Sequence, residues 1–202
     1  MAQPRVPNRR EQILTEASRL FAAGGFNGTA IRLIAKTCGI TEAAIYRHFE
    51  SKVHLYEEVI RAKATEHDIA GQLARPTDDQ DIEQVLAGLA EYVLDLAGQD
   101  PELMQLMLNN SRENDPATTV LFQEIRLPLI DHLAAEIKNR VESGELREVD
   151  PVITARCFVG MVVDCALSIG VWEIINRQSI KSTTVIGNNI PIFARGLIRP
   201  SV

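Results

Sequence analysis

The chain has 202 residues, 46% hydrophobic and 24% charged, so it can form one or two soluble globular domains with a substantial core. Three cysteines without paired short spacing argue against a disulfide framework or a zinc site. There is neither a signal peptide nor a run of about 18 apolar residues, which predicts a cytoplasmic protein without membrane spans. The net charge of −6 divides into +4 from Met1 to Lys63 and −10 over the remainder, so only the N-terminal part is basic.

The chain should begin with a polar, disordered arm, Met1–Pro7, followed by a helix from about Asn8 to Ala23. An apolar stripe that includes Ile13 and Phe21 marks this helix, and Gly24-Gly25 should end it. Three basic residues in and after the arm are candidates for contacts with phosphates or a minor groove: Arg5, Arg9 and Arg10.

Residues 29–49 have the pattern of two short helices joined by a tight turn. Thr29 is expected to cap the first helix and Thr41 the second, and Gly39 can supply the positive φ that the turn requires. Ile45 and Phe49 lie four residues apart on the second helix and should face inward. The pattern predicts a helix-turn-helix, a motif that places its second helix in the major groove of DNA.

The exposed side of the second helix favours DNA binding over an ordinary corner between two helices. Two short residues would let the helix approach base edges, and several hydrogen-bond donors follow them. Lys52 begins the next helix, where the helix dipole favours a phosphate. The short residues and the donors are Ala43, Ala44, Tyr46, Arg47 and His48.

The rest of the chain is predicted to be helical as well, which makes the fold class all-α. Ser51 should cap a helix that starts at Lys52 and continues to about Ala70, followed by a loop, Gly71–Asp81. Pro128 is expected to kink the long helix that contains it. The further helices expected are Ile82–Ala97, Pro101–Asn109, Pro116–Ser143, Pro151–Arg177 and Ile190–Ile198.

The stretch Cys157–Trp172 is apolar nearly all round, with Asp164 as its single charge. A helix that is apolar on every side is buried on every side, so this one needs cover from its own domain and from a second subunit. The pattern therefore predicts a homodimer. Cys38, Cys157 and Cys165 are interpreted as small core residues.

The first quarter to third of the chain resembles the tetracycline-repressor (TetR) family of bacterial transcriptional regulators. Val53 departs from the family, in which an acidic residue often follows the lysine. The remainder shares only the family's size and all-helical layout. The matching residues are Leu20-Phe21, Gly25-Phe26, Thr29, Ile34-Ala35, Gly39-Ile40-Thr41, Ile45-Tyr46, His48-Phe49, Lys52 and Leu55.

This resemblance implies a three-helix DNA-binding domain at residues 1–52 and a larger helical ligand-binding and dimerisation domain at 53–202. It also implies a repressor that binds a palindromic operator in double-stranded DNA as a homodimer and is released by a small-molecule inducer. Thr29 would contact phosphate or act only as a cap. Arg47 would read a guanine or bind phosphate, and His48 would bind phosphate or pack. The recognition-helix contacts carried over are Thr41, Ala43, Ala44, Tyr46, Arg47 and His48.

The family further implies a ligand cavity in the larger domain, although plain core is the simpler interpretation of each wall residue. Asp164 would hold a ligand, pair with Arg156 or Arg126, or contact the other subunit. Scattered histidines without a nucleophile, metal or phosphate-loop motif argue against an enzyme, a metal site or a cofactor. Control by a protein partner remains the alternative. The predicted walls are Met104, Met107, Leu108, Phe122, Phe158, Val162, Asp164 and Trp172.

Overall fold

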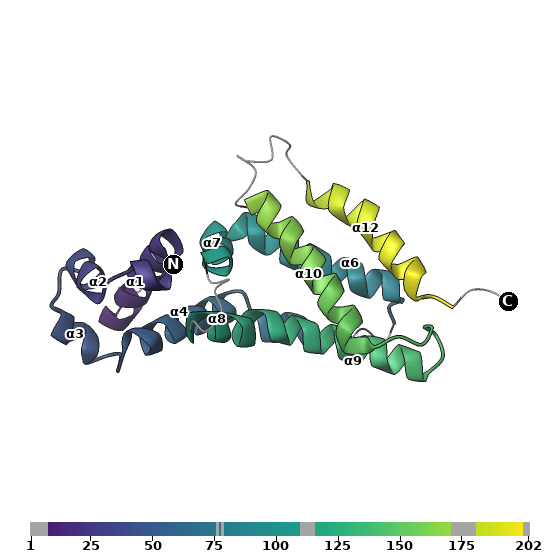
Figure 1. Cartoon of the computed structure of the whole chain (residues 1–202), viewed down its shortest axis with the longest axis horizontal. Helices are drawn as coiled ribbons and strands as arrows, with labels where there is room; N and C mark the ends of the chain where they lie inside the picture. The colour runs from purple at the N-terminus through teal and green to yellow at the C-terminus, as the bar shows by residue number, and fades with distance from the viewer. Residues whose placement is uncertain (1–7, 76, 78, 110–115, 171–180, 200–202) are drawn as a thin grey trace, which may run out of the picture. The chain divides into compact units, whose positions relative to one another are not determined.

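The computed structural model describes residues 8–75, 77, 79–109, 116–170 and 181–199, and the chain divides into two compact units. The first unit contains Met1–Glu66 and Gln105–Glu124, and the second contains His67–Met104 and Ile125–Val202. Every regular element in the described residues is a helix (Figure 1). The predicted all-α class is therefore confirmed, whereas the predicted arm, Met1–Pro7, lies outside the described residues.

The first unit is built on three N-terminal helices and α4. Asn8 and Glu11 form a reciprocal capping box at the start of α1, and Gly25 breaks the helix with a φ of +69°. Phe21, Phe26 and Tyr56 pack together, with ring centroids 5.1 Å apart for Phe21–Tyr56 and 5.4 Å for Phe26–Tyr56. This aromatic cluster joins α1 to α4. The helices are α1 (Arg9–Gly28), α2 (Ile31–Thr37), α3 (Glu42–Tyr46), α4 (Lys52–Glu66) and α8 (Pro116–Leu121).

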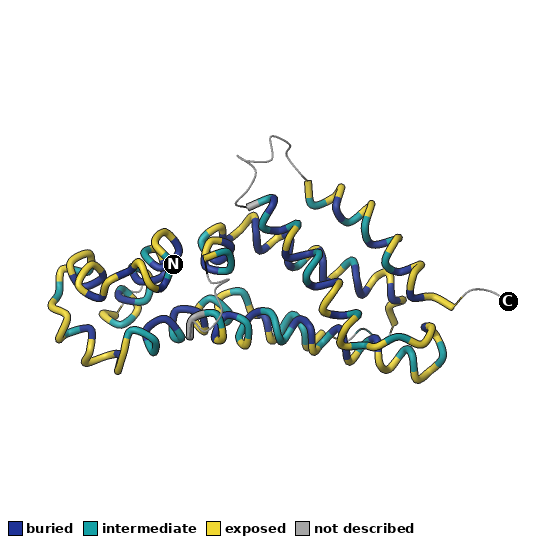
Figure 2. The backbone as a smooth tube through the Cα atoms, in the orientation of Figure 1, coloured by how far each residue is buried: buried dark blue, intermediate teal, exposed yellow. Residues whose placement is uncertain are grey.

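The second unit packs around α10, which lies against both α6 and α9 (Figure 1). The helix α12 covers another side of α6. Buried positions recur along α6 at helical spacing, among them Ile82, Val85, Leu89 and Val93, as expected for an amphipathic helix. Figure 2 shows buried segments along α9 and α10 as well. The helices are α5 (Ile69–Leu73), α6 (Ile82–Gln99), α7 (Pro101–Asn109, whose last residues belong to the first unit), α9 (Leu127–Glu142), α10 (Pro151–Gly170) and α12 (Ser182–Leu197).

Several predicted boundaries are wrong. The fourth helix ends at Glu66 and not at Ala70, because Asp68 adopts a left-handed conformation with φ of +48° and a short helix, α5, begins inside the predicted extension and runs into the predicted loop. The closing helix begins at Ser182, eight residues before the predicted start, and contains Pro191. Its residues Val185 and Ile190 are buried, so packing compensates for the hydrogen bond that proline removes.

The expected disturbance at Pro128 is a π-helical turn, Phe122–Arg126, between α8 and α9. Proline has no N–H to donate, and Pro128 lies in the first turn of α9, directly after the residues in which the hydrogen bonding is π-helical. The long helix then ends at Glu142, two residues before Gly144, which has a φ of +82°.

The helix α10 has one buried and one exposed side in the single chain. Phe158 and Val162 are buried, whereas Cys157 and Asp164 are exposed. The prediction that Cys157 is a core residue is therefore wrong for one protomer. By length and composition, Pro151–Ile169 could also span a membrane, a test that core helices of soluble proteins pass too.

Candidate nucleic-acid interface

The helix α3 is fixed by its N-cap, by the turn before it and by its buried inner face. The Thr41 hydroxyl accepts a hydrogen bond from the Ala44 N–H at 3.2 Å, which confirms Thr41 as its N-cap. Gly39 has a φ of +66° in the turn, as predicted. Ile45 of α3 is 0% exposed, so the inner face of the helix belongs to the core. The helix ends at Tyr46, so Phe49, predicted on the same helix, lies after it, although it is buried as expected at 1% exposure. This anchoring leaves the opposite face available to a partner.

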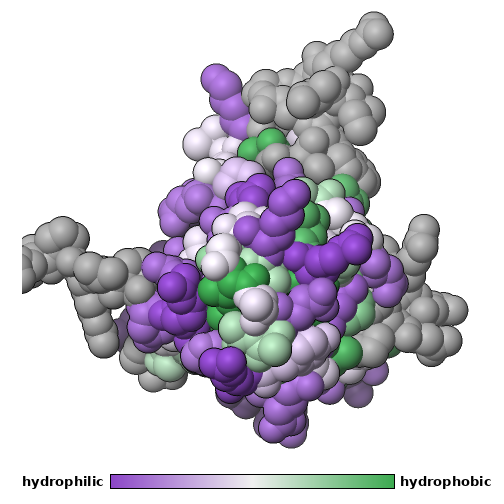
Figure 3. Space-filling model, turned by 90° about the vertical axis from the view of Figure 1, so that its left-hand side faces the viewer, coloured by the Kyte–Doolittle hydropathy of each residue, from purple (hydrophilic) through white to green (hydrophobic). Residues whose placement is uncertain are grey.

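The outer face of α3 combines short side chains with donors. Tyr46, the last residue of α3, is 48% exposed, and Arg47 and His48 directly after the helix are exposed as well, while Ala44 is half-buried. Figure 3 looks onto the end of the first unit that carries α2 and α3, and hydrophilic side chains dominate that face around a small hydrophobic area. The exposed candidates are Thr41, Ala43, Tyr46, Arg47 and His48.

Lys52 lies at the first turn of α4. The Ser51 hydroxyl accepts from the His54 N–H at 3.0 Å, which confirms Ser51 as the cap. The Lys52 ammonium lies 4.5 Å from the centroid of the Phe26 ring, a cation–π contact that holds the half-buried side chain against the core. A positive charge held at a helix N-terminus is suited to a phosphate.

Thr29 does not have the role expected of it. The N-cap of α2 is Ala30, and the Thr29 hydroxyl instead shares its single hydrogen between the carbonyls of Leu20 and Gly25, which lie 3.0 and 2.9 Å from Oγ1. Thr29 is only 2% exposed and is the C-cap of α1, so its side chain stabilises the end of that helix. Its hydroxyl is therefore occupied by the protein and is not presented to a phosphate.

Arg9 and Arg10 differ in whether their guanidinium groups are available to contact DNA. Arg9 is exposed, and its guanidinium contacts only Gln12 of its own helix, at 3.0 Å. Arg10 pairs with Glu58 of α4 and lies 5.2 Å from the Phe49 ring centroid, so its charge serves the packing of α1 on α4. Burial alone would raise the pKa of Glu58, but hydrogen bonds from Arg10 and Arg61 outweigh it and lower the pKa below its ordinary value.

Two further cations of the helix-turn-helix were not predicted from the sequence as candidates for DNA contacts. Arg32 and Lys36 are exposed on α2, which packs against α3. Their spacing of four residues places both on one side of α2, away from buried Ile31, Ile34 and Ala35. The four-residue spacing of Arg32 and Lys36 is already visible in the sequence.

The predicted ligand walls do not form one group. Met107, Leu108 and Phe122 belong to the first unit, and Met104, Phe158, Val162 and Asp164 belong to the second, while Trp172 lies outside the described residues. A cavity of 160 Å³ in the second unit has other walls. It is lined by Gln72, Leu73, Arg75, Thr77, Gln80, Val85, Gly88, Leu89, Tyr92 and His132.

Asp164 was expected to be buried and therefore paired or directed into a cavity, which is wrong for the single chain. The carboxylate projects from the exposed side of α10, and no ion pair with Arg126 or Arg156 forms in the part of the chain that the structure describes. Water can solvate it there, so this position no longer supports a ligand contact.

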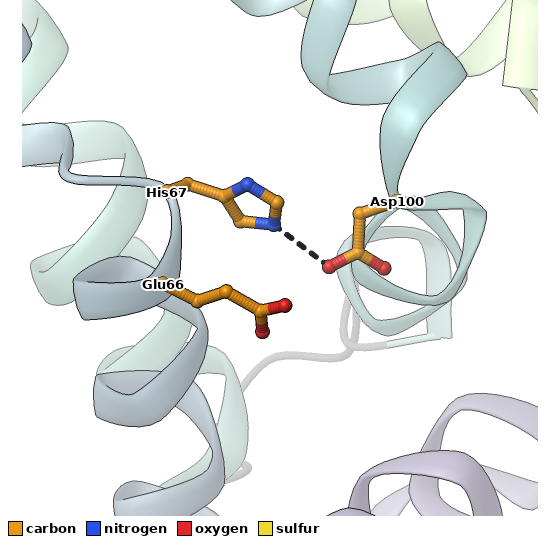
Figure 4. A group of neighbouring side chains, drawn as sticks. All are labelled: Glu66, His67 and Asp100. Atoms are coloured by element: carbon orange, nitrogen blue, oxygen red, sulfur yellow. Dashed lines mark hydrogen bonds and ion pairs between the residues drawn. The ribbon is translucent and has the colours of Figure 1, made fainter. Parts of the chain in front are cut away.

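A buried polar contact in the second unit was also missed. His67 points at Asp100, with Nε2 2.8 Å from Oδ2 (Figure 4). The Tyr92 hydroxyl donates to the His67 carbonyl at 3.2 Å. Burial, and then the charge of Asp68, raise the pKa of Tyr92 to about 12, so this hydroxyl remains a donor at neutral pH. The three residues join α6 to the segment that follows α4.

Comparison with known proteins agrees with this geometry. Residues 13–59 match the family model described as bacterial regulatory proteins, tetR family. The chain is 29% identical to the nucleoid occlusion factor SlmA of Aliivibrio fischeri over 175 residues, 80% of this chain and 84% of that protein. It is 24% identical to the HTH-type transcriptional repressor AcnR of Corynebacterium glutamicum over 161 residues, 80% of this chain and 81% of that protein.

The fold extends the likeness beyond the helix-turn-helix. The crystal structure of the transcriptional regulator FadR from Bacillus subtilis in complex with stearoyl-CoA superimposes with a TM-score of 0.73 at 16% identity, covering 92% of this chain and 97% of that one. At that identity the match shows the fold alone. With the family match over α1 to α4, the resemblance inferred from the sequence is confirmed: the chain carries at residues 13–59 the N-terminal domain of the tetR family of bacterial regulatory proteins.

Proposed function

We propose that this protein is a DNA-binding transcriptional regulator that represses its target by binding a palindromic operator as a homodimer and is released by a small molecule. The observation that carries the proposal is the short helix α3, whose inner face is fixed by buried Ile45, while Tyr46 at its end and Arg47 and His48 directly after it are exposed. A rigid helix with exposed donors is what major-groove recognition requires. The relative AcnR is a repressor by name, which agrees with this mode of action.

Arg47 is the residue that we assign to base recognition, and the others position the helix on the backbone. A guanidinium fork matches the O6 and N7 acceptors of guanine. Thr41, Tyr46, His48 and Lys52 are assigned to phosphates, and Ala43 and Ala44 to close approach. Arg32 and Lys36 add positive charge to the same motif, which strengthens its sequence-independent attraction to DNA.

The homodimer is supported by the uncovered side of α10. Val152 and Ile153 are 51% and 59% exposed, and Ile192 of α12 is 67% exposed. Exposed large apolar residues on two helices of one unit favour burial against a second copy. Two copies would then place their α3 helices roughly 34–36 Å apart, one turn of DNA.

The inducer is supported by the cavity in the second unit and by the FadR structure, which contains stearoyl-CoA. For function we divide the chain into a DNA-binding domain, 1–52, and a ligand-binding and dimerisation domain, 53–202. The packing units differ from this division because α4 packs against α1 and therefore groups with the N-terminal helices.

Selection of bound duplexes from a random pool tests the DNA-binding step. We expect enrichment of a palindrome, with an affinity that falls steeply as salt rises because phosphate contacts release counterions. The variant Arg47→Ala should lose the preference, whereas Arg195→Ala, an exposed arginine of α12, should retain it. A protein that recovers no enriched sequence at low salt would contradict the proposal.

Control by a protein partner is the second candidate, because the relative SlmA is a nucleoid occlusion factor by name. The two candidates differ in what relieves DNA binding. If small molecules that bind the second unit leave the operator complex unchanged, while a protein captured on the DNA-bound form alters it, the second candidate is supported.

A further inference from the structure

The cavity of 160 Å³ in the second unit lies between α6, α9 and the residues that follow α5. Val85, Leu89 and Tyr92 line it from α6, and their spacing of four and three residues places them on one side of that helix. His132 lines it from α9. All the wall residues belong to the second unit, so the cavity is built within one of the two compact units.

The part of the wall that follows α5 is held in place by α9. The Thr77 hydroxyl donates to Glu136 at 2.7 Å, and Nη2 of Arg140 donates to the Gln80 carbonyl at 2.8 Å. Glu136 also lies 3.7 Å from Nε of Arg140, which compensates its charge. These contacts shape the wall in the absence of a ligand, and ligand sites are usually preformed in this way.

The polar residues of the wall are rich in hydrogen-bond donors. Arg75 offers its guanidinium, His132 a ring N–H, and Gln72 and Gln80 their side-chain amides. None of these four side chains forms a hydrogen bond or an ion pair with the residues that the structure describes. No carboxylate lines the cavity, since Asp68 acts on Tyr92 electrostatically without being part of the wall. An oxyanion could therefore bind here without displacing a partner in the described part of the chain.

A cavity of 470 Å³ in the first unit has the opposite charge arrangement. It is lined by Arg10 and Arg61, but also by Glu58, which pairs with both arginines. Its positive charge is therefore compensated within the protein. Residues 64–202 carry a net charge of −10, so an arginine in a wall without carboxylates is not what the composition of this part predicts. The wall of the smaller cavity is suited to an anion from outside the chain.

The size of the smaller cavity and its apolar walls limit what the anion can be. A cavity of about 150 Å³ holds benzene, whereas drug-sized ligands occupy about 300–1,000 Å³. Leu73, Val85 and Leu89 supply apolar surface. Tyr92 adds its ring, because its hydroxyl hydrogen is donated to the His67 carbonyl at 3.2 Å. A ligand with one small apolar group and one acidic group fits these walls.

We propose that this cavity binds a compact organic anion, a carboxylate or a phosphate ester no larger than one aromatic ring with one acidic group. Arg75 and His132 contact the oxyanion, with Gln72 and Gln80 as further donors. A guanidinium fork binds either kind of oxyanion in a bidentate manner. The apolar part of the wall contacts the body of the ligand.

The assignment names the ligand class of the regulator proposed above, and its regulatory meaning rests on that proposal. Binding itself does not depend on it, so the two can fail separately. A chain that binds the anion through Arg75 but selects no DNA would retain the site and lose the regulator. The reverse result would retain the regulator and remove the site.

Calorimetric titration of the full chain with benzoate, phenyl phosphate and benzyl alcohol tests the charge requirement. We expect at least one of the two anions to bind more tightly than uncharged benzyl alcohol, and the tighter anion distinguishes a carboxylate from a phosphate ligand. Arg75→Gln should weaken anion binding about tenfold, within the range for a charge-assisted hydrogen bond, and leave benzyl alcohol unchanged. Arg75 is exposed, so the variant should fold as the parent does. Arg195→Gln, at an exposed position of α12, is the matched control.

The variant Gly88→Leu tests whether the anion enters this cavity. Gly88 lines it from the middle of α6, and a Cβ there would meet no atom within 4 Å. Leucine should occupy cavity space and weaken anion binding about tenfold or more, while the thermal midpoint stays equal or rises because leucine favours a helix over glycine. Gly98→Leu, at an exposed position of the same helix, is the control and should bind as the parent does.

Three results would overturn the site. Equal affinity for benzyl alcohol and both anions would remove the charge requirement. Anion binding that is unchanged in Arg75→Gln would place the anion elsewhere, even if Gly88→Leu proves unstable. Tighter binding of biphenyl-4-carboxylate, a two-ring acid, than of benzoate would contradict the size limit.

Discussion

Asp100 connects His67 to the start of α7 through its two oxygens. Oδ2 lies 2.8 Å from Nε2 of His67, and Oδ1 accepts from the Leu103 N–H at 2.9 Å. One buried carboxylate thus caps a helix and orients a histidine 33 positions away, a contact that the sequence did not indicate.

Replacing Asp100 with alanine should therefore destabilise the protein. The change removes an N-cap and leaves His67 without its buried partner, which together should cost about 2–4 kcal/mol. Urea unfolding measures this free energy, with Asp95→Ala, an exposed position on α6, as control. Equal unfolding free energies for the two variants would show that the contact adds nothing.

Arg47→Ala should discriminate between base and backbone contact. A bidentate contact to guanine is worth about 1–3 kcal/mol, so affinity for the selected operator should fall by that amount while random duplexes are bound as before. Fluorescence anisotropy at one fixed salt concentration gives both values. An equal loss on both duplexes would assign Arg47 to a phosphate.

Gly39→Ala should strain the turn of the helix-turn-helix. An added Cβ meets no atom within 4 Å, so the cost comes from its φ of +66° and should be about 1–2 kcal/mol. Gly98→Ala in α6 also meets no atom, but there φ is helical and the change should stabilise by up to about 1 kcal/mol. Thermal unfolding compares the two, and a neutral Gly39→Ala would show that the turn relaxes.

The Arg10–Glu58 pair should make the free energy of unfolding depend on pH in the acidic range, below about pH 4.5. Since folding lowers the pKa of Glu58, the pair's contribution is complete above the ordinary value of 4.5 and is lost as pH falls through the lower folded value. Glu58→Gln should therefore reduce stability at pH 7 and narrow the difference between pH 7 and pH 3. Glu83→Gln, at an exposed site on α6, should leave the profile unchanged.

Ile153→Arg should separate the proposed dimer. The side chain is 59% exposed in one protomer, so a cation there should leave the monomer folded but oppose burial against a second copy. Light scattering should show half the parent mass, with unchanged helical circular dichroism and weaker operator binding. Asp131→Arg on α9 is the control for added charge at an exposed site. A variant of full mass would move the interface elsewhere.

The helix-turn-helix was predictable because its determinants are local. Gly39, Thr41 and Ile45 each act within a few residues of their own position, through a turn, a cap and a helix face. Thr29 was misjudged because its hydroxyl is claimed by the carbonyl of Leu20, nine residues away, which only tertiary packing brings near.

The second unit was less predictable for the same physical reason. An apolar residue has the same pattern whether it lines a cavity or fills the core, so Phe158 and Met104 could not be told from plain core. Asp164, the single charge of Cys157–Trp172, was also misinterpreted, because a carboxylate at the edge of a helix face and one at its centre look alike in the sequence. Asp164 lies on the exposed side.

The π-helical turn at Phe122–Arg126 also sets which side chains of the following helix, α9, face the core. Each residue advances an α-helix by about 100°, and the wider turn absorbs one extra residue. Deleting a single residue there would restore a regular spiral, but it would also rotate Leu129, Ile130 and Leu133 out of the interior that they now fill. We therefore expect a one-residue deletion at this point to destabilise the second unit, even though it would leave an uninterrupted helix.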